Sequence, residues 1–333
     1  MKENKFEEPA KRETGFSEIV GVNPEQKGKV SNFAKEVLDN QSRKTIFENS
    51  PEIGQFEREK TREETEMIKD ILDKMPDFVR RYGGIPIFLE PKHIHILDES
   101  RLDEETRKKK LESEEGGGYL PDQQFAYIFD AGSNLINAQK IIHEILHFNS
   151  FQSLEKVPEE SKSLRTRLRR VGFQIFSYNP KDKKDVYSPE NIYFNEFNEA
   201  VIEELTKRFD KEYFDSIPGT AEGVKERQSF IDKYSPKEDN DISSVITKQL
   251  ESGKWRTVIK QYEYSKERRK LNELTKDIYE RNPDRFESTE DVFNVFAKAT
   301  MGGKLSETAR LIEKTYGKGS FRKWGEGTKY KKK

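Results

Sequence analysis

His143, Glu144 and His147 form an H-E-x-x-H motif near the middle of the chain. On a helix, side chains four residues apart lie on one face, one turn apart, so both imidazoles can bind the same metal ion. Glu144 directly follows the first histidine and can reach a water molecule on that ion. The 333-residue chain has only 4 histidines, which makes a chance match rare. The motif predicts a hydrolytic zinc site; the alternative is a buried helix whose histidines only form hydrogen bonds.

A third ligand is needed, because a catalytic zinc ion takes three protein ligands and leaves one position for water. The chain contains no cysteine, and no histidine follows His147, so a ligand downstream of the motif must be a carboxylate. Glu199 is the preferred candidate because it lies in a predicted helix over residues 196–205. The absence of cysteine also excludes disulfides, thiolate zinc ligands and a cysteine nucleophile.

The motif and the N-E-A-x-x-E pattern of residues 198–203 together resemble the gluzincin zinc metallopeptidases, the thermolysin-like group. The resemblance covers roughly residues 120–210, which include both predicted helices. It implies that His143, His147 and Glu199 bind Zn²⁺ and that Glu144 is the general base. The expected reaction is hydrolysis of a peptide bond by a water molecule that the metal activates.

The same resemblance suggests residues that support this site. Glu203, four residues after Glu199, would orient a zinc-bound histidine, and thermolysin has aspartate there; Asn198 lies beside the ligand. The group commonly stabilises the oxyanion with a tyrosine or histidine from the C-terminal half. No histidine occurs there in this chain, so Tyr262 and Tyr264 are the candidates.

Period-two patterns predict strands on both sides of the motif. Residues 125–129 directly precede the motif helix and could form the sheet edge that pairs with an extended peptide, or equally a core strand. His93 and His95 share one face of a predicted strand over residues 93–97, a face that we interpret as exposed rather than metal-binding. The remaining strand predictions are residues 85–89 and a hairpin of residues 172–178 with 186–194.

The chain is predicted to be α+β, with a zincin-like metallopeptidase core and a mostly helical C-terminal part. The core consists of a small mixed sheet and the H-E-x-x-H helix. Residues 1–55 are expected to be a mobile segment with a short helix, 56–210 the catalytic core, 211–320 a helical subdomain and 321–333 a basic tail. Helical stripes are predicted over residues 30–38, 221–234, 242–251, 262–281, 289–299 and 304–316. A long helix from residue 57 either ends near Pro76 or continues to Tyr82, and residues 102–115 form a charged helix or loop. Ser288 and Asp291 resemble a capping box at the start of the helix over 289–299.

Charge and hydropathy exclude several classes of partner. Lys+Arg 61 against Asp+Glu 62 leaves a net charge of -1, so no global field attracts nucleic acid or an anionic membrane. The basic run over residues 165–170 is interpreted as solvated surface. The N-terminus lacks the apolar core of a signal peptide, and no run is long enough to span a bilayer. We therefore expect a cytoplasmic protein whose partner is a peptide or protein substrate.

The predicted function is zinc-dependent peptide hydrolysis. One alternative is a catalytically inactive gluzincin-like module that binds a partner through the same cleft. Another is a helical interaction protein in which the motif is accidental. Metal content separates the last possibility from the first two, and an activity assay separates the first two from each other.

Overall fold

A computed structural model describes residues 12–39, 54–102, 116–120, 125–157, 165–179, 189–234, 241–249, 253–327 and 330–331. Helices and three β-sheets alternate along these residues, so the α+β prediction is confirmed. The predicted helix or loop over residues 102–115 lies almost entirely outside the described residues. None of the described helices combines the length and the apolar character that crossing a lipid bilayer requires.

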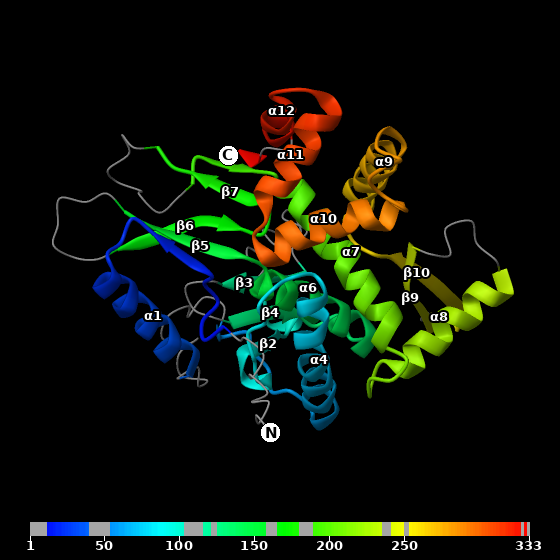
Figure 1. Ribbon diagram of the computed structural model, residues 1–333. Helices are drawn as coiled ribbons and strands as arrows, with labels where there is room; N and C mark the ends of the chain where they lie inside the picture. The colour runs from blue at the N-terminus through cyan, green and yellow to red at the C-terminus, as the bar shows by residue number, and fades with distance from the viewer. Residues whose placement is uncertain are drawn as a thin grey trace, which may run out of the picture.

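The motif helix α6 (Asn134–Asn149) lies at the centre of the molecule (Figure 1). It packs on α4 (Arg62–Arg81), on α7 (Asn195–Tyr213) and on a three-stranded sheet. Every residue of α6 from Leu135 to Asn149 except Lys140 is buried. A helix that is enclosed on all sides holds its side chains in fixed positions, as a metal site requires.

Helix α4 forms because its sequence contains both a start signal and an apolar stripe. Thr61 and Glu64 form a reciprocal capping box at its N-terminus. Met67, Ile68 and Ile71 begin the stripe, which is fully buried and continues through Pro76. The longer of the two predicted forms of this helix is therefore confirmed, with a later start.

The three-stranded sheet has the order β2 (Ile94–Leu97), β4 (Phe125–Phe129), β3 (Gly117–Leu120). Strand β2 is parallel to β4, and β3 is antiparallel to it. Strand β4 is thus the central strand, and β3 is the edge, so the edge interpretation of residues 125–129 is wrong. Residues 85–89 form no strand; Ile87 makes one isolated bridge with Arg12.

A six-stranded sheet lies on the other side of the C-terminal end of α6. Its order is β1 (Glu18–Val20), β5 (Gln152–Lys156), β6 (Thr166–Val171), β7 (Gln174–Ser177), β8 (Asn191–Tyr193), β11 (Tyr330–Lys331). The predicted hairpin corresponds to β7 and β8, which are antiparallel. Strands β5 and β6 were missed because their charged residues give little apolar alternation.

Both ends of the chain contribute to this sheet, which corrects two predictions. Strand β1 pairs in parallel with β5 and is followed by α1 (Pro24–Asp39), so residues 12–28 are not a mobile segment. Residues 320–327 form α12 (Ser320–Gly327), and β11 pairs with β8, so much of the basic tail is folded. Trp324 of α12 packs edge-on against Phe197 of α7, with ring centroids 4.3 Å apart.

The C-terminal part contains α8 (Ala221–Tyr234), α9 (Ser265–Arg281), α10 (Thr289–Gly302) and α11 (Leu305–Tyr316). Ser288 and Asp291 form the predicted capping box of α10. The predicted helix over 242–251 is wrong. These residues are β9 (Ile242–Gln249), which forms an antiparallel hairpin with β10 (Trp255–Gln261). A short apolar stripe rich in β-branched residues fits the helical period of 3.6 and the strand period of 2 about equally well. Pairing with β10 selects the strand.

One hydrophobic cluster extends from Met67 of α4 to Ile312 of α11. It includes buried side chains of α6, α7, α9 and α10. The segments predicted as a catalytic core and a helical subdomain therefore share one core. Figure 1 shows α8 and the β9–β10 hairpin on the side of α7 away from the larger sheet.

Candidate metal centre and active site

Helices α6 and α7 bring the predicted ligands together. The Nε2 atoms of His143 and His147 are 3.1 Å apart. The Oε2 atom of Glu199 lies 3.3 Å from His143 Nε2 and 3.0 Å from His147 Nε2. Among the described residues, these three side chains are the group of histidine and acidic residues that could hold a metal ion.

The geometry of this metal group fits a tetrahedral ion. Donor atoms bound at about 2.0–2.1 Å to one tetrahedral ion lie roughly 3.3 Å from each other. The three observed separations, 3.0 to 3.3 Å, are close to that value. The Nε2 atoms of the two histidines and the Oε2 atom of Glu199 are potential metal ligands that face one another, and a cation between them would stabilise this arrangement. The donor set of two imidazoles and one carboxylate is typical of catalytic zinc.

Glu203 orients His143 as the resemblance implies. Its Oε2 atom is 2.8 Å from His143 Nδ1. An ionised carboxylate can only accept, so Nδ1 carries a proton, and Nε2 is the nitrogen that could bind a metal ion after it loses its own proton. The other oxygen, Oε1, accepts a hydrogen bond of 2.9 Å from the backbone N–H of Glu263. Glu203 thereby joins the metal group to the loop between β10 and α9.

Gln174 of β7 orients the carboxylate ligand, and sequence reasoning missed it. Its Nε2 atom donates to Glu199 Oε1 at 3.1 Å and to Asn195 Oδ1 at 2.9 Å. The bond to Oε1 leaves Oε2 directed at the histidines. Gln174 lies in a predicted strand, but nothing in its local sequence distinguishes it from an exposed polar residue.

Asn198 supports the backbone rather than a zinc-bound histidine. It is fully buried, and its Oδ1 atom accepts a 2.8 Å hydrogen bond from Phe173 N. This bond fixes the tight turn between β6 and β7, where Gly172 has a φ of +54°. A Cβ atom at Gly172 would lie only 2.3 Å from Asn198 Oδ1, so the turn requires glycine.

Glu144 lies beside the metal group with a strongly perturbed carboxyl. Burial raises its pKa to about 7, while the charges of His143 and His147 act in the opposite direction. Burial alone would lower the pKa of His143, but its hydrogen bonds to Glu199 and Glu203 hold that pKa well above the usual value. Burial likewise opposes ionisation of Glu199, yet the histidines keep its pKa below the usual range. Such opposed shifts are typical of catalytic sites.

Tyr264 adjoins the metal group, as one of the two predicted oxyanion donors. Its ring stacks on His143, with centroids 5.7 Å apart and planes 14° apart. Its φ of +51° is unusual for a residue with a side chain and occurs at the N-cap of α9. The O atom of Tyr264 accepts a 2.8 Å hydrogen bond from Arg268 N, which helps to hold this conformation.

Tyr262 has a different role. Its side chain is 3% exposed, and its hydroxyl donates to Asp210 Oδ2 at 2.7 Å. The same hydroxyl accepts from Arg227 Nη1 at 3.1 Å. Because the hydroxyl belongs to this buried network, Tyr262 connects α7 and α8 to the hairpin. The structure thus favours Tyr264 over Tyr262 as the donor near the metal group.

An open cleft passes over the metal group. One wall is the edge strand β3, and Gly117 brings its backbone close to Glu144: a Cβ there would lie 3.2 Å from Glu144 Oε1. The facing wall comes from the six-stranded sheet and is largely apolar, with Leu168, Phe176 and Ile192. Among the described strands, β3 pairs only with β4, and its residues Gly117–Leu120 line the cleft.

The other two histidines lie apart from this site and are not on an exposed face. His93 and His95 are only 3% and 4% exposed, so the interpretation of an exposed strand face is wrong. His93 ends a short 3₁₀ helix (Pro91–His93), and its Nδ1 accepts from Glu90 N at 2.9 Å. His95 Nδ1 lies 2.8 Å from Glu57 Oε1. Both imidazoles serve the packing around β2.

The segment before β1 holds the C-terminal end of the motif helix. Arg12 Nη2 donates to Asn149 O at 2.6 Å, and Nη1 donates to Ser150 O at 3.0 Å. A guanidinium at the C-terminal end of a helix donates hydrogen bonds to the last carbonyl oxygens, which have no partner within the helix. Its positive charge also interacts favourably with the negative end of the helix dipole. The basic run is similarly engaged: Arg170 donates to the backbone oxygens of Gly303 and Ala299, so it is not simply solvated surface.

Comparison with known proteins adds no identification. No protein-family model, curated protein or solved structure matches this chain. The metal group and its cleft are therefore the features that bear on the function of this protein.

Proposed function

We propose that this protein is a zinc-dependent peptidase of the gluzincin type, with a zincin-like core. The observation that carries the proposal is the convergence of His143 Nε2, His147 Nε2 and Glu199 Oε2 within 3.0 to 3.3 Å of one another. The hydrogen bond of Glu203 to His143 supports it, because a metal-binding histidine commonly donates its other N–H to a carboxylate.

Each residue of the site has a defined task in this proposal. His143, His147 and Glu199 would hold a zinc ion, which would supply a water molecule of lowered pKa and a Lewis acid for the carbonyl oxygen of the substrate. Glu144 accepts a proton from the attacking water on its carboxylate and passes it to the nitrogen of the leaving amine. The Tyr264 hydroxyl donates a hydrogen bond to the oxyanion that develops on the carbonyl oxygen. Glu203 keeps the His143 proton on Nδ1.

A peptide is the substrate class that the cleft fits. Strand β3 lies at the edge of its sheet among the described strands and would present backbone N–H and C=O groups to an extended chain, which would add to the sheet as another strand. This pairing places main-chain carbonyls beside Glu144, because β3 approaches its carboxylate at Gly117. The apolar wall of Leu168, Phe176 and Ile192 then contacts the side chains of the bound peptide.

Zinc content and peptide hydrolysis, measured on three proteins, test the proposal. The wild type should contain about one zinc per chain by elemental analysis and cleave members of a broad peptide library. Glu144→Gln should retain the zinc and lose hydrolysis, because an amide cannot accept the proton. Glu199→Ala should lose the zinc. Glu196→Gln, an exposed position on the same helix α7, is the control and should resemble the wild type.

The outcomes separate the alternatives. A wild-type protein that binds no zinc would refute the metal site and leave an accidental motif. A zinc-loaded protein that cleaves no peptide would favour an inactive module that binds its partner in the cleft. Zinc binding by Glu199→Ala equal to that of the wild type would refute the ligand assignment.

A further inference from the structure

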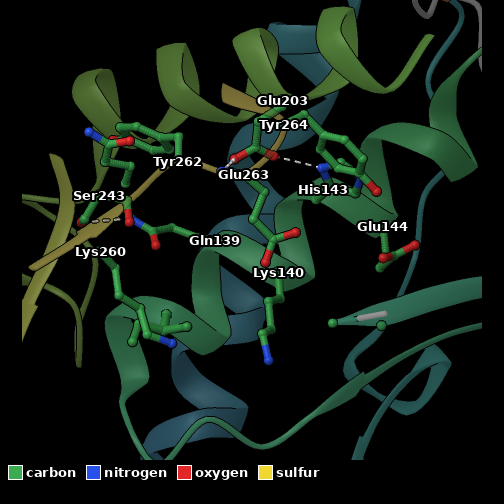
Figure 2. A pocket seen from close by; sticks show the side chains of 14 residues that line it. Gln139, Lys140, His143, Glu144, Glu203, Ser243, Lys260, Tyr262, Glu263 and Tyr264 are labelled. Carbon is green, nitrogen blue, oxygen red and sulfur yellow. Dashed lines mark hydrogen bonds and ion pairs between the residues drawn. The ribbon is translucent and has the colours of Figure 1, made fainter. Parts of the chain in front are cut away.

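A second cavity opens from the metal group on the side away from the apolar wall. Its cavity volume is about 100 Å³, and it lies between α6, the end of β10 and the loop that leads to α9. His143, Glu144 and Tyr264 form its inner end. Figure 2 shows these residues at one side of the cavity and Lys140, Lys260 and Glu263 around the rest. We call this cavity the lysine pocket.

Lys140 supplies a partly buried positive charge to the lysine pocket. Its Nζ atom donates to Phe129 O at 3.0 Å, and within the described residues it forms no ion pair with a carboxylate. Burial lowers its pKa, the charges of Glu263, Asp130 and Glu144 oppose this shift, and Lys260 acts in the same direction as burial. An ammonium group in this position has N–H donors left and gains from a further anion.

Among the described residues, none of the acidic side chains that line the pocket, Glu144, Glu203 and Glu263, forms an ion pair with Lys140. Glu203 is occupied by His143 and by the backbone of Glu263. Burial raises the pKa of Glu263, which therefore takes up a proton more readily than an exposed glutamate and can then donate to a carboxylate. A cationic side chain entering here would meet both Lys140 and Lys260.

We propose that the lysine pocket binds a carboxylate of the substrate, next to the bond that is cleaved. This inference deepens the proposed peptidase function and rests on it. The carboxylate can belong to an aspartate or glutamate side chain inside the peptide, or to the C-terminus of the peptide. Both sources offer the same planar anion to the Lys140 ammonium, and they are distinguished by the choice of peptide.

The specificity test compares quenched fluorescent peptides that differ at one residue beside the cleaved bond. Peptides with glutamate there should have a kcat/KM about tenfold or more above those with glutamine, and lysine should be disfavoured. Lys140→Met should remove the preference for glutamate, so that the ratio of kcat/KM between the glutamate and glutamine peptides falls to about one. Lys69→Met, an exposed lysine on α4, is the matched control and should keep the preference.

Two further variants guard against misfolding of Lys140→Met. Lys140→Arg keeps the charge and should keep the preference for glutamate. Lys260→Met changes an exposed residue at the mouth and should weaken the preference by about two- to fivefold. Peptides with a free or an amidated C-terminus identify the source: loss of the Lys140 effect on amidation assigns the pocket to the terminal carboxylate.

A binding measurement separates this inference from the proposed function. Zinc-loaded Glu144→Gln is mixed with fluorescein-labelled glutamate, glutamine and lysine peptides, and fluorescence anisotropy gives each Kd. Tighter binding of the glutamate peptide that depends on Lys140 supports the inference, even if the wild type cleaves nothing. Cleavage or binding with no preference for a carboxylate, or with a preference for lysine through Glu263, overturns it and leaves the peptidase proposal intact.

Discussion

Replacing Glu203 with glutamine should weaken zinc binding although the side chain keeps its shape. The carboxylate now accepts two hydrogen bonds, from His143 Nδ1 at 2.8 Å and from Glu263 N at 2.9 Å. Glutamine has only one acceptor oxygen, and its NH₂ group would face the other N–H donor. The variant therefore loses either the orientation of His143 or the anchor of the loop before Tyr264.

The size of the effect follows from these bonds. A hydrogen bond to a charged group contributes about 1.5–3 kcal/mol, and a neutral one about 0.5–1.5 kcal/mol. The difference, roughly 1–2 kcal/mol, corresponds to a zinc Kd about 5- to 30-fold higher, since about 1.4 kcal/mol is tenfold. This range overlaps the loss of metal affinity, roughly 10- to 100-fold, that follows removal of a carboxylate hydrogen-bonded to a metal-binding histidine.

Competition with a chromophoric chelator of known affinity measures this Kd at fixed pH. Glu196→Gln makes the same chemical change at an exposed position of α7 and should bind zinc like the wild type. Far-UV circular dichroism verifies that both variants are folded. An unchanged zinc Kd for Glu203→Gln would refute the claim that Glu203 orients His143.

Three other predictions concern pH, catalysis and folding. Hydrogen bonds to carboxylates raise the pKa of metal-free His143, so zinc must displace a proton when it binds. The affinity for zinc should therefore increase as the pH rises toward that pKa. Calorimetry in buffers of different ionisation enthalpy measures the number of protons released. Tyr264→Phe should lower kcat about 100-fold at unchanged zinc Kd, whereas Tyr262→Phe should lower the free energy of unfolding by about 1–3 kcal/mol; the reverse pattern would exchange their roles. Gly172→Ala should destabilise the fold in urea by more than about 1 kcal/mol, while Gly28→Ala, in open space on α1, should be neutral or stabilising.

The helices were largely predictable because their signals are local. The stripe of α4 and the capping box of α10 depend on residues three to four positions apart, whereas the continuation of α4 past Pro76 was left open by the sequence. The strands were less predictable. Strand β6 is rich in arginine, and β3 begins with glycines, so neither has a local β signal. Both exist because partners distant in the sequence pair with them, β5 in one case and β4 in the other.

The residues around the site divide in the same way. The pairing of His143 and His147 was predictable because ligand chemistry is a property of side-chain type and the i, i+4 spacing is a property of one helix. Gln174 was not predictable, because its contact with Glu199 requires β7 to lie beside α7. The charged walls of the lysine pocket also arise from segments more than a hundred residues apart, Lys140 on α6 and Glu263 after β10.

The sequence by itself determined which side chains can bind a metal and which helix presents them, since no cysteine and no later histidine left a carboxylate as the downstream choice. Only the tertiary structure decided that Glu199, among 62 acidic residues, meets His143 and His147. The physical reason is the shared core. Helices α6 and α7 bury their apolar faces against each other and against α4, and that packing sets the distance between side chains that no local pattern relates.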